Sequence, residues 1–162
     1  MHDSIAALAE GFRVSTNLYL KALYDLPPET FVARIEGLAN PIVWIAGHLV
    51  HFRSRLAFVI GAPDRAVPWT GLFATGSQPM EPSQYPPIEE IIQAWRDVSA
   101  DIDARFEELT GEELVGPPPV RVATPDGTLR GAIALFAFHD AYHIGQVALI
   151  RKVLGQPPLI HG

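Results

Sequence analysis

The sequence predicts an all-α protein built as a four-helix bundle, and three observations support this fold. Four long segments carry apolar residues at steps of three and four, the repeat of one helix face. Prolines and glycines separate these segments from one another. With 162 residues, 48% of them apolar, the chain is long enough for one core, so we expect a single domain over residues 1–162.

The first two predicted helices have clear boundaries. The first spans about residues 3–26 and ends at a pair of prolines. The second starts at Asn40-Pro41, where the asparagine is expected to cap the helix and the proline to occupy its first position. Gly61 ends it, because glycine readily adopts the left-handed conformation that terminates helices.

The third and fourth predicted helices enclose an irregular segment. The third spans about residues 87–109, and the fourth runs from a cap at Thr128 to a stop at Gly155. Residues 110–127 contain a run of prolines and a Pro-Asp-Gly turn signal. A short hairpin around that turn is the alternative to a direct cap at Thr128.

Residues 62–87 form a long, proline-rich linker between the second and third predicted helices. Its aromatic residues, among them Trp69 and Phe73, offer surface to bury, so we expect the linker to be ordered. It is long enough to span a helix of ~30 Å, which allows the two flanking helices to run parallel. The sequence leaves open whether the linker is a plain crossover or the lid or wall of a pocket.

The composition excludes several functions. The chain has 18 acidic and 12 basic residues, a net charge of −6 and no basic run, so a nucleic-acid partner is not expected. No apolar run reaches the ~20 residues of a membrane span, and the first residues lack the features of a signal peptide. We therefore expect a cytoplasmic protein with no membrane partner. Without cysteine, the chain has neither disulfides nor a thiol nucleophile.

Two histidines of the fourth predicted helix form the most informative pattern. His139 and His143 lie four residues apart, so their side chains project from one helix face, roughly 6 Å apart at Cβ. They continue the apolar stripe of that helix, and we expect them to face the interior. Two such imidazoles can share a metal ion at ~2.0–2.1 Å, and hydrogen bonds to carbonyl or carboxylate groups are the alternative.

A third histidine, His48, lies on the apolar stripe of the second predicted helix, between Ile45 and Phe52. Three protein ligands with an open fourth position are the pattern of a catalytic metal site, and helical bundles commonly hold metals between facing helices. A hydrogen-bonded core histidine is the alternative for His48. His51 is expected to be partly exposed, and His161, in the C-terminal tail, has no expected role.

Two motifs resemble those of the DinB-like (YfiT-like) metalloenzyme superfamily. Residues 40–49, in which Trp44 precedes His48-Leu49, resemble its second-helix motif. Residues 139–146 resemble its H-x-x-x-H-x-G-Q motif on the last helix, the more specific of the two. The order of the motifs, with a long linker and one helix between them, also fits, so the resemblance covers essentially the whole chain.

The resemblance implies an up-down-down-up bundle with a divalent metal on His48, His139 and His143. Homodimers are frequent in this superfamily, so a homodimer is expected. Its members include thiol S-transferases that use low-molecular-weight bacterial thiols and maleylpyruvate isomerase-type relatives, and many have no known reaction. Three imidazoles suit several metals, of which Zn or Ni is expected first, with Fe, Co or Mn as alternatives.

Three residues near the histidines are candidates for a catalytic role. Asp140 could orient water or a ligand, or lie on the surface, because one step along a helix is a turn of ~100°. Tyr142 could donate to a bound oxyanion or pack at a helix interface. Gln146 could hydrogen-bond a ligand histidine or pack at the helix surface. A zincin protease is not expected, because Asp140 stands where the H-E-x-x-H motif requires glutamate.

The favoured function is a metal-dependent enzyme that acts on a small molecule, of the thiol S-transferase type. Because the chain has no cysteine, the nucleophilic sulfur would arrive with a low-molecular-weight thiol, beside an electrophile bound under the linker 62–87. A metal-dependent hydrolase is a further reading of the same site. A non-catalytic metal-binding or dimerisation module, and a bundle with buried histidines and no metal, are the alternatives from other functional classes.

Overall fold

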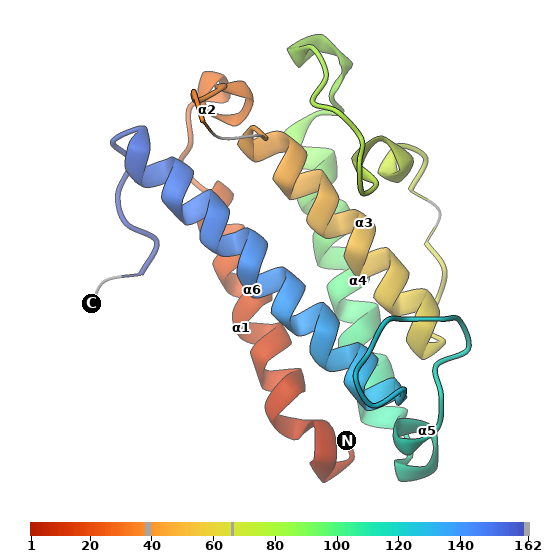
Figure 1. Cartoon of the computed structure of the whole chain (residues 1–162). Helices are drawn as coiled ribbons and strands as arrows, with labels where there is room; N and C mark the ends of the chain where they lie inside the picture. The colour runs from red at the N-terminus through yellow and green to blue at the C-terminus, as the bar shows by residue number, and fades with distance from the viewer. Residues whose placement is uncertain (38–39, 66, 161–162) are drawn as a thin grey trace.

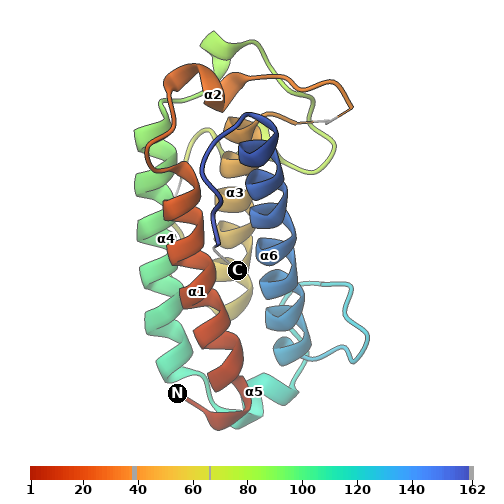
Figure 2. The ribbon, with the colours of Figure 1, turned by 90° about the vertical axis from the view of Figure 1, so that its left-hand side faces the viewer.

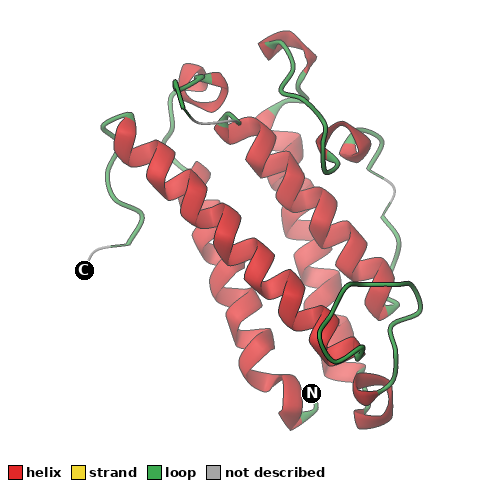
Figure 3. Ribbon diagram, viewed as in Figure 1, coloured by secondary structure: helices red, strands yellow, loops and turns green. Residues whose placement is uncertain are grey.

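The protein is a bundle of four long helices, which confirms the predicted fold; its structure is a computed structural model (Figure 1). Residues 1–37, 40–65 and 67–160 are described, so His161 lies outside the described residues. No β-strand occurs in these ranges (Figure 3). The long helices are α1 (Ala6–Leu23), α3 (Ile42–Ile60), α4 (Ile88–Glu108) and α6 (Leu129–Val153). The short elements are η1 (Asp3–Ile5), α2 (Pro28–Val32), η2 (Thr70–Phe73), η3 (Pro82–Gln84) and α5 (Gly111–Val115).

In chain order, the four long helices run up, down, down and up (Figures 1 and 2). The linker leaves the lower end of α3 and returns along the bundle to the upper end, where α4 begins, so that α3 and α4 run parallel (Figure 1). Around the bundle, α1 packs against α4 and α6, and α3 packs against the same two helices. The topology that the family resemblance implied is the one observed.

Most of the predicted helix ends are confirmed, and one cap is wrong. Gly61 closes α3 in the left-handed conformation, with φ 74°. The side chain of Thr128 accepts from the backbone N–H of Gly131 at 2.9 Å, so the direct cap of α6 replaces the hairpin alternative. Asn40 does not cap α3. Pro41 occupies the cap position in an extended conformation, and its carbonyl accepts the first helical hydrogen bonds.

Helix α5 was not predicted, although its start carries a clear signal. Thr110 Oγ1 accepts from Glu113 N at 3.2 Å, and a carboxylate oxygen of Glu113 accepts from Thr110 N at 2.8 Å, a reciprocal capping box. Leu114 is buried in the core, and the carbonyl of Gly116 accepts from Leu129 N at 2.8 Å. The short helix therefore closes the lower end of the bundle and fixes the point where α6 begins.

Two apolar clusters fill the bundle, separated by a polar layer. Members of the upper cluster, nearer α2, include Tyr19, Leu49, Trp95 and Ile144. Members of the lower cluster include Phe12, Leu56, Phe106 and Ile133. Near the boundary of the two clusters each long helix contributes one polar side chain to a hydrogen-bonded polar layer: Thr16, Arg53, Ser99 and Asp140.

Arg53 is the centre of the polar layer. Its Nη1 donates to Thr16 Oγ1 at 3.0 Å and to Ser99 Oγ at 2.9 Å, and its Nε donates to Asp140 Oδ2 at 2.8 Å. The guanidinium carbon also lies 4.0 Å from the ring centre of Trp95. Burying two charges is costly, and the cost is offset where the charges pair with each other and make further hydrogen bonds, as Arg53 does here. A shift of α6 along α3 would break the pair, so the layer fixes the register of the two helices.

The length and mean composition of α6 would allow it to cross a membrane, although polar residues such as Asp140 interrupt its apolar sequence. The core helices of soluble proteins meet the same two criteria. Here α6 packs against α1 and α3 and buries the charged side chains of Asp140 and Arg151. The expected absence of a membrane partner stays a prediction.

Candidate metal centre

Three histidines from two helices meet between α3 and α6. His48 of α3 lies opposite His139 and His143 of α6, and one ring nitrogen from each lies within 4.8 Å of the other two. The Nε2 atoms of His48 and His139 are 3.2 Å apart. Ligand atoms of a tetrahedral site with bonds of ~2.0–2.1 Å are separated by about 3.3–3.4 Å. The predicted convergence is confirmed, and the cluster could bind a metal ion.

Hydrogen bonds at the far side of two rings fix which nitrogen faces the centre. The carbonyl oxygen of Phe73 lies 2.6 Å from His48 Nδ1, and the side-chain oxygen of Gln146 lies 2.7 Å from His143 Nδ1. Both partners accept, so both Nδ1 atoms carry the hydrogen and each Nε2 keeps its lone pair for a metal. Gln146 therefore makes the hydrogen bond to a candidate ligand that the sequence offered as one of its two roles.

The linker orients His48 through close packing on α3. Phe73 is fully buried, and a Cβ atom added to Gly47 would lie 2.5 Å from the Phe73 ring. Only glycine at this position allows the linker to come so near that the Phe73 carbonyl reaches His48. On its other side the His48 ring stacks on Trp44, with centroids 4.7 Å apart and planes 16° apart. The imidazole is thus held by contacts from both α3 and the linker.

His139 is held by packing and lacks a hydrogen bond at its second nitrogen. Its ring stacks on Phe52 with centroids 3.8 Å apart and planes 17° apart. Its Nδ1 atom is buried and has no hydrogen-bond partner among the described residues. Its Nε2 faces the Nε2 lone pair of His48, so the pair must share either a proton or a cation. This arrangement fits a divalent metal, because both lone pairs can then point at the same ion.

Both histidines of α6 are less buried than the sequence predicted. His139 and His143 are half-buried, whereas Asp140 and Ile144 occupy the innermost positions of the same helix. Asp140 points into the core, where it pairs with Arg53. The neighbouring positions His139 and His143 therefore lie nearer the edge of the α3–α6 interface. The centre therefore lies at the edge of the bundle, where a ligand can reach it.

All three imidazoles of the centre favour the neutral form. Burial, together with the neighbouring His143 and His48, lowers the pKa of His139 from its ordinary value of 6.5 to about 3. Burial also lowers the pKa of His48, and that of His143. Neutral imidazole is the form that binds metals, so at pH 7 the cluster needs no deprotonation before it takes an ion.

His51 lies outside the cluster, as expected. It is half-buried and packs edge-on against Phe52, with ring centroids 5.7 Å apart. Burial lowers its pKa, and the positive charge of Arg55 lowers it further. Because His51 shares the helix of His48 without joining the centre, it provides a matched control for substitutions of the ligand histidines.

A cavity of about 350 Å³ opens beside the centre, with His139 and His143 in its wall. Its other walls are α3 and the connection 116–128, which folds over α6 (Figure 1). The residues that shape it include Phe52, Arg55, Arg121, Val122, Phe138 and Tyr142. None of the linker residues that the structure describes lines it. The electrophile site expected under the linker 62–87 stays a prediction: linker residues Arg65 and Trp69 line another cavity, of about 370 Å³, whereas the cavity that His139 and His143 line lies under the connection 116–128.

A comparison with known protein families finds a match that covers most of the chain. The family model of the DinB superfamily matches residues 12–147. The chain belongs to the DinB superfamily. The resemblance stated from the two histidine motifs is thereby confirmed. A comparison with curated protein sequences finds no match.

The three catalytic candidates of this DinB protein lie in different surroundings. Tyr142 is exposed and lines the cavity, edge-on to His143 with ring centroids 5.0 Å apart. Asp140 is neither at the cavity nor on the surface, since it is 2% exposed and its carboxylate is bonded to Arg53. Arg53 itself was missed from the sequence, although it continues the apolar series of Leu49 and Leu56 at helical spacing.

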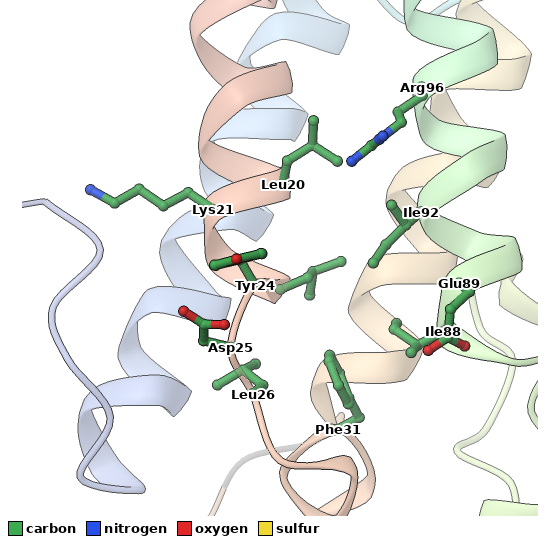
Figure 4. A pocket seen from close by; sticks show the side chains of 11 residues that line it. Leu20, Lys21, Tyr24, Asp25, Leu26, Phe31, Ile88, Glu89, Ile92 and Arg96 are labelled. Carbon is green, nitrogen blue, oxygen red and sulfur yellow. The ribbon is translucent and has the colours of Figure 1, made fainter.

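A further cavity of the DinB bundle, of about 410 Å³, shares no lining residue with the one beside the histidines, and Figure 4 shows the side chains that line it. Its walls come from the ends of α1 and α4 and from α2, and they include Tyr24, Phe31, Ile92 and Arg96. No histidine lines it. Of these two cavities, only the one under the connection 116–128 is lined by histidines of the candidate centre.

Proposed function

We propose that this DinB protein is a metal-dependent enzyme that acts on a small molecule, of the thiol S-transferase type. The observation that carries the proposal is the convergence of three imidazole nitrogens at the edge of a cavity, with His48 and His139 Nε2 3.2 Å apart. Structural metal sites are closed by four protein ligands, whereas this cluster offers three and leaves one position to a substrate.

The residues present fit a divalent ion. His48, His139 and His143 would hold it, and Phe73 and Gln146 keep two of the rings turned correctly. A divalent ion bound there lowers the pKa of a coordinated water to ~7 and deprotonates a coordinated thiol. The set of three neutral imidazoles suits Zn or Ni first, and Fe, Co or Mn as alternatives.

The rest of the site would bind the substrates. The chain has no cysteine, so a low-molecular-weight thiol must supply the sulfur nucleophile. The cavity beside His139 and His143 offers about 350 Å³ for the second substrate. The hydroxyl of Tyr142 belongs to its wall and can donate to negative charge that develops on that substrate. With water in place of the thiol, the same residues would support hydrolysis.

The experiment is an activity screen of the protein purified without a nickel column. Low-molecular-weight thiols are combined with small electrophiles, with and without a chelator. We expect thiol consumption that the chelator abolishes and that added metal restores. His143→Ala should abolish it, whereas His51→Ala, the matched control, should retain it. Stoichiometric metal binding with no thiol transfer and no hydrolysis contradicts the enzyme and indicates a non-catalytic metal-binding module.

The expected homodimer and the cytoplasmic location remain proposals from the sequence and the family. Light scattering of the purified protein tests the first, and fractionation of cells that express it tests the second.

A further inference from the structure

The cavity beside the histidines contains two arginines that have no acidic partner. Arg55 comes from α3 and Arg121 from the connection 116–128. Neither has a carboxylate within 4 Å among the residues that the structure describes. Four other arginines contact carboxylates, namely Arg13, Arg53, Arg65 and Arg105, whereas Arg34, Arg96, Arg130 and Arg151 contact none among the described residues but do not line this cavity. Two guanidinium groups are thus left at one cavity in a protein of net charge −6.

The remaining wall of this cavity is mainly apolar and aromatic. Phe52, Phe138 and Tyr142 contribute aromatic rings, and Leu135 and Val122 contribute aliphatic side chains. Phe138 is 67% exposed, an unusual position for phenylalanine in a folded chain. A ligand that covers it would remove apolar surface from water, and this favours binding. The wall therefore suits an apolar body as well as an anionic group.

Phe52 contacts both a candidate ligand histidine and one of the two arginines. Its ring centre lies 3.8 Å from that of His139 and 5.5 Å from the Arg55 guanidinium carbon. Arg55, Arg121, His139 and His143 line the same cavity, so one small molecule bound there has all four residues in its walls. The cavity holds the volume of about a dozen water molecules, at ~30 Å³ each.

We infer that the second substrate is a small organic acid with an aromatic or aliphatic body. Its carboxylate is bound by Arg55 and Arg121, its body lies against Phe52, Phe138 and Tyr142, and its other end faces the histidines. The planar fork of a guanidinium matches the two oxygens of a carboxylate. This inference rests on the proposed function, because it names the electrophile class of the same site.

The test measures binding of phenylacetate and of its neutral isostere phenylacetamide by isothermal titration, to protein with and without bound zinc. We expect phenylacetate to bind at least tenfold more tightly than phenylacetamide. Arg55→Gln and Arg121→Gln should each weaken phenylacetate binding about three- to tenfold, with little effect on phenylacetamide. The control is Arg130→Gln, an exposed arginine of α6 that does not line the cavity, and it should bind both compounds as the wild type does.

The outcomes separate this inference from the proposed function. If phenylacetate shows no preference over phenylacetamide, or if both cavity variants lose no more than Arg130→Gln, the substrate class is overturned while the metal centre stands. If the protein takes up no zinc at all, and its preference for phenylacetate still depends on the two arginines, the substrate class stands and the proposed metal-dependent enzyme fails. A preference that requires zinc but is unchanged in both arginine variants places the carboxylate on the metal and overturns the assignment to the arginines.

Discussion

Arg53 of α3 and Asp140 of α6 form a buried ion pair, with Nε donating to Oδ2 at 2.8 Å, and Asp140 directly follows His139 in the chain. The pair joins the two helices that carry the candidate metal ligands. Removing one member of the pair would leave the other charge buried without a partner, and this is the most destabilising way to disrupt a buried ion pair.

Asp140→Ala should therefore destabilise the protein by about 3–5 kcal/mol, because Arg53 would remain buried without its carboxylate. Urea unfolding of metal-free protein measures this change. Replacing both residues by apolar ones should cost less than the single change. Asp103→Ala, which removes a partner of the surface residue Arg13, serves as the control and should cost much less. A loss for Asp140→Ala no larger than for this control would contradict the role of the polar layer.

The packing of the linker predicts a specific effect of Gly47→Ala. The added Cβ would lie 2.5 Å from the Phe73 ring, so the ring must move and carry its carbonyl away from His48. We expect a loss of stability of about 1–3 kcal/mol together with weaker metal binding.

Gly11→Ala is the matched control, since nothing lies within 4 Å of its added Cβ and the site is inside α1. It should leave metal binding unchanged and stabilise the fold slightly, because alanine favours helix over glycine. Unchanged metal affinity in Gly47→Ala would show that the linker does not orient His48.

Substitution of Gln146 should weaken metal binding without changing the stability of the fold. Its side-chain oxygen accepts from His143 Nδ1 at 2.7 Å and thereby presents Nε2 to the centre. Gln146→Leu should weaken metal binding about 10- to 100-fold with little change in the melting temperature. Gln146→Glu keeps an acceptor oxygen and should restore most of the affinity. Competition with a chromophoric chelator measures both values, and equal affinity of the leucine variant and the wild type would remove Gln146 from the site.

The lowered pKa values of the histidines predict how the metal-free protein responds to acid. His139 has a pKa of about 3 in the folded chain against 6.5 for an ordinary histidine, and the pKa values of His48 and His143 are lowered too. Between these values the unfolded chain binds protons that the folded chain does not, so stability falls as pH drops from 6.5 toward 3. The melting temperature should decline over this interval.

His139→Gln removes the largest of these shifts and should flatten the decline. Melting curves of chelator-treated wild type and variant, recorded from pH 7 to about pH 4, make the comparison. An identical slope in the two proteins would show that His139 does not resist protonation in the fold.

Local signals in the sequence were sufficient for the four long helices. The Thr128 cap, the Gly61 stop and the apolar periodicity depend on residues within one or two turns of each other, and such signals can be read without a tertiary structure. The same holds for the spacing of His139 and His143. The capping box of α5 is a signal of this kind that was overlooked between Thr110 and Glu113.

The features that were missed depend on contacts between distant segments. Arg53 and Asp140 lie 87 residues apart in the chain, and only the packed bundle shows that they form a pair. The cavity depends on how the connection 116–128 folds over α6, which no periodicity predicts. Consequently Arg121, which reaches the cavity from that connection, could not be assigned to the site from the sequence.

The central claim is that His48, His139 and His143 hold one metal ion, and metal content of protein purified without an affinity tag that binds nickel tests it most directly. Inductively coupled plasma analysis of the wild type should give one divalent ion per chain. His48→Ala, His139→Ala and His143→Ala should each lose that ion while His51→Ala keeps it. Folded wild-type protein that carries no metal, and takes up none when titrated with Zn or Ni, would contradict the claim.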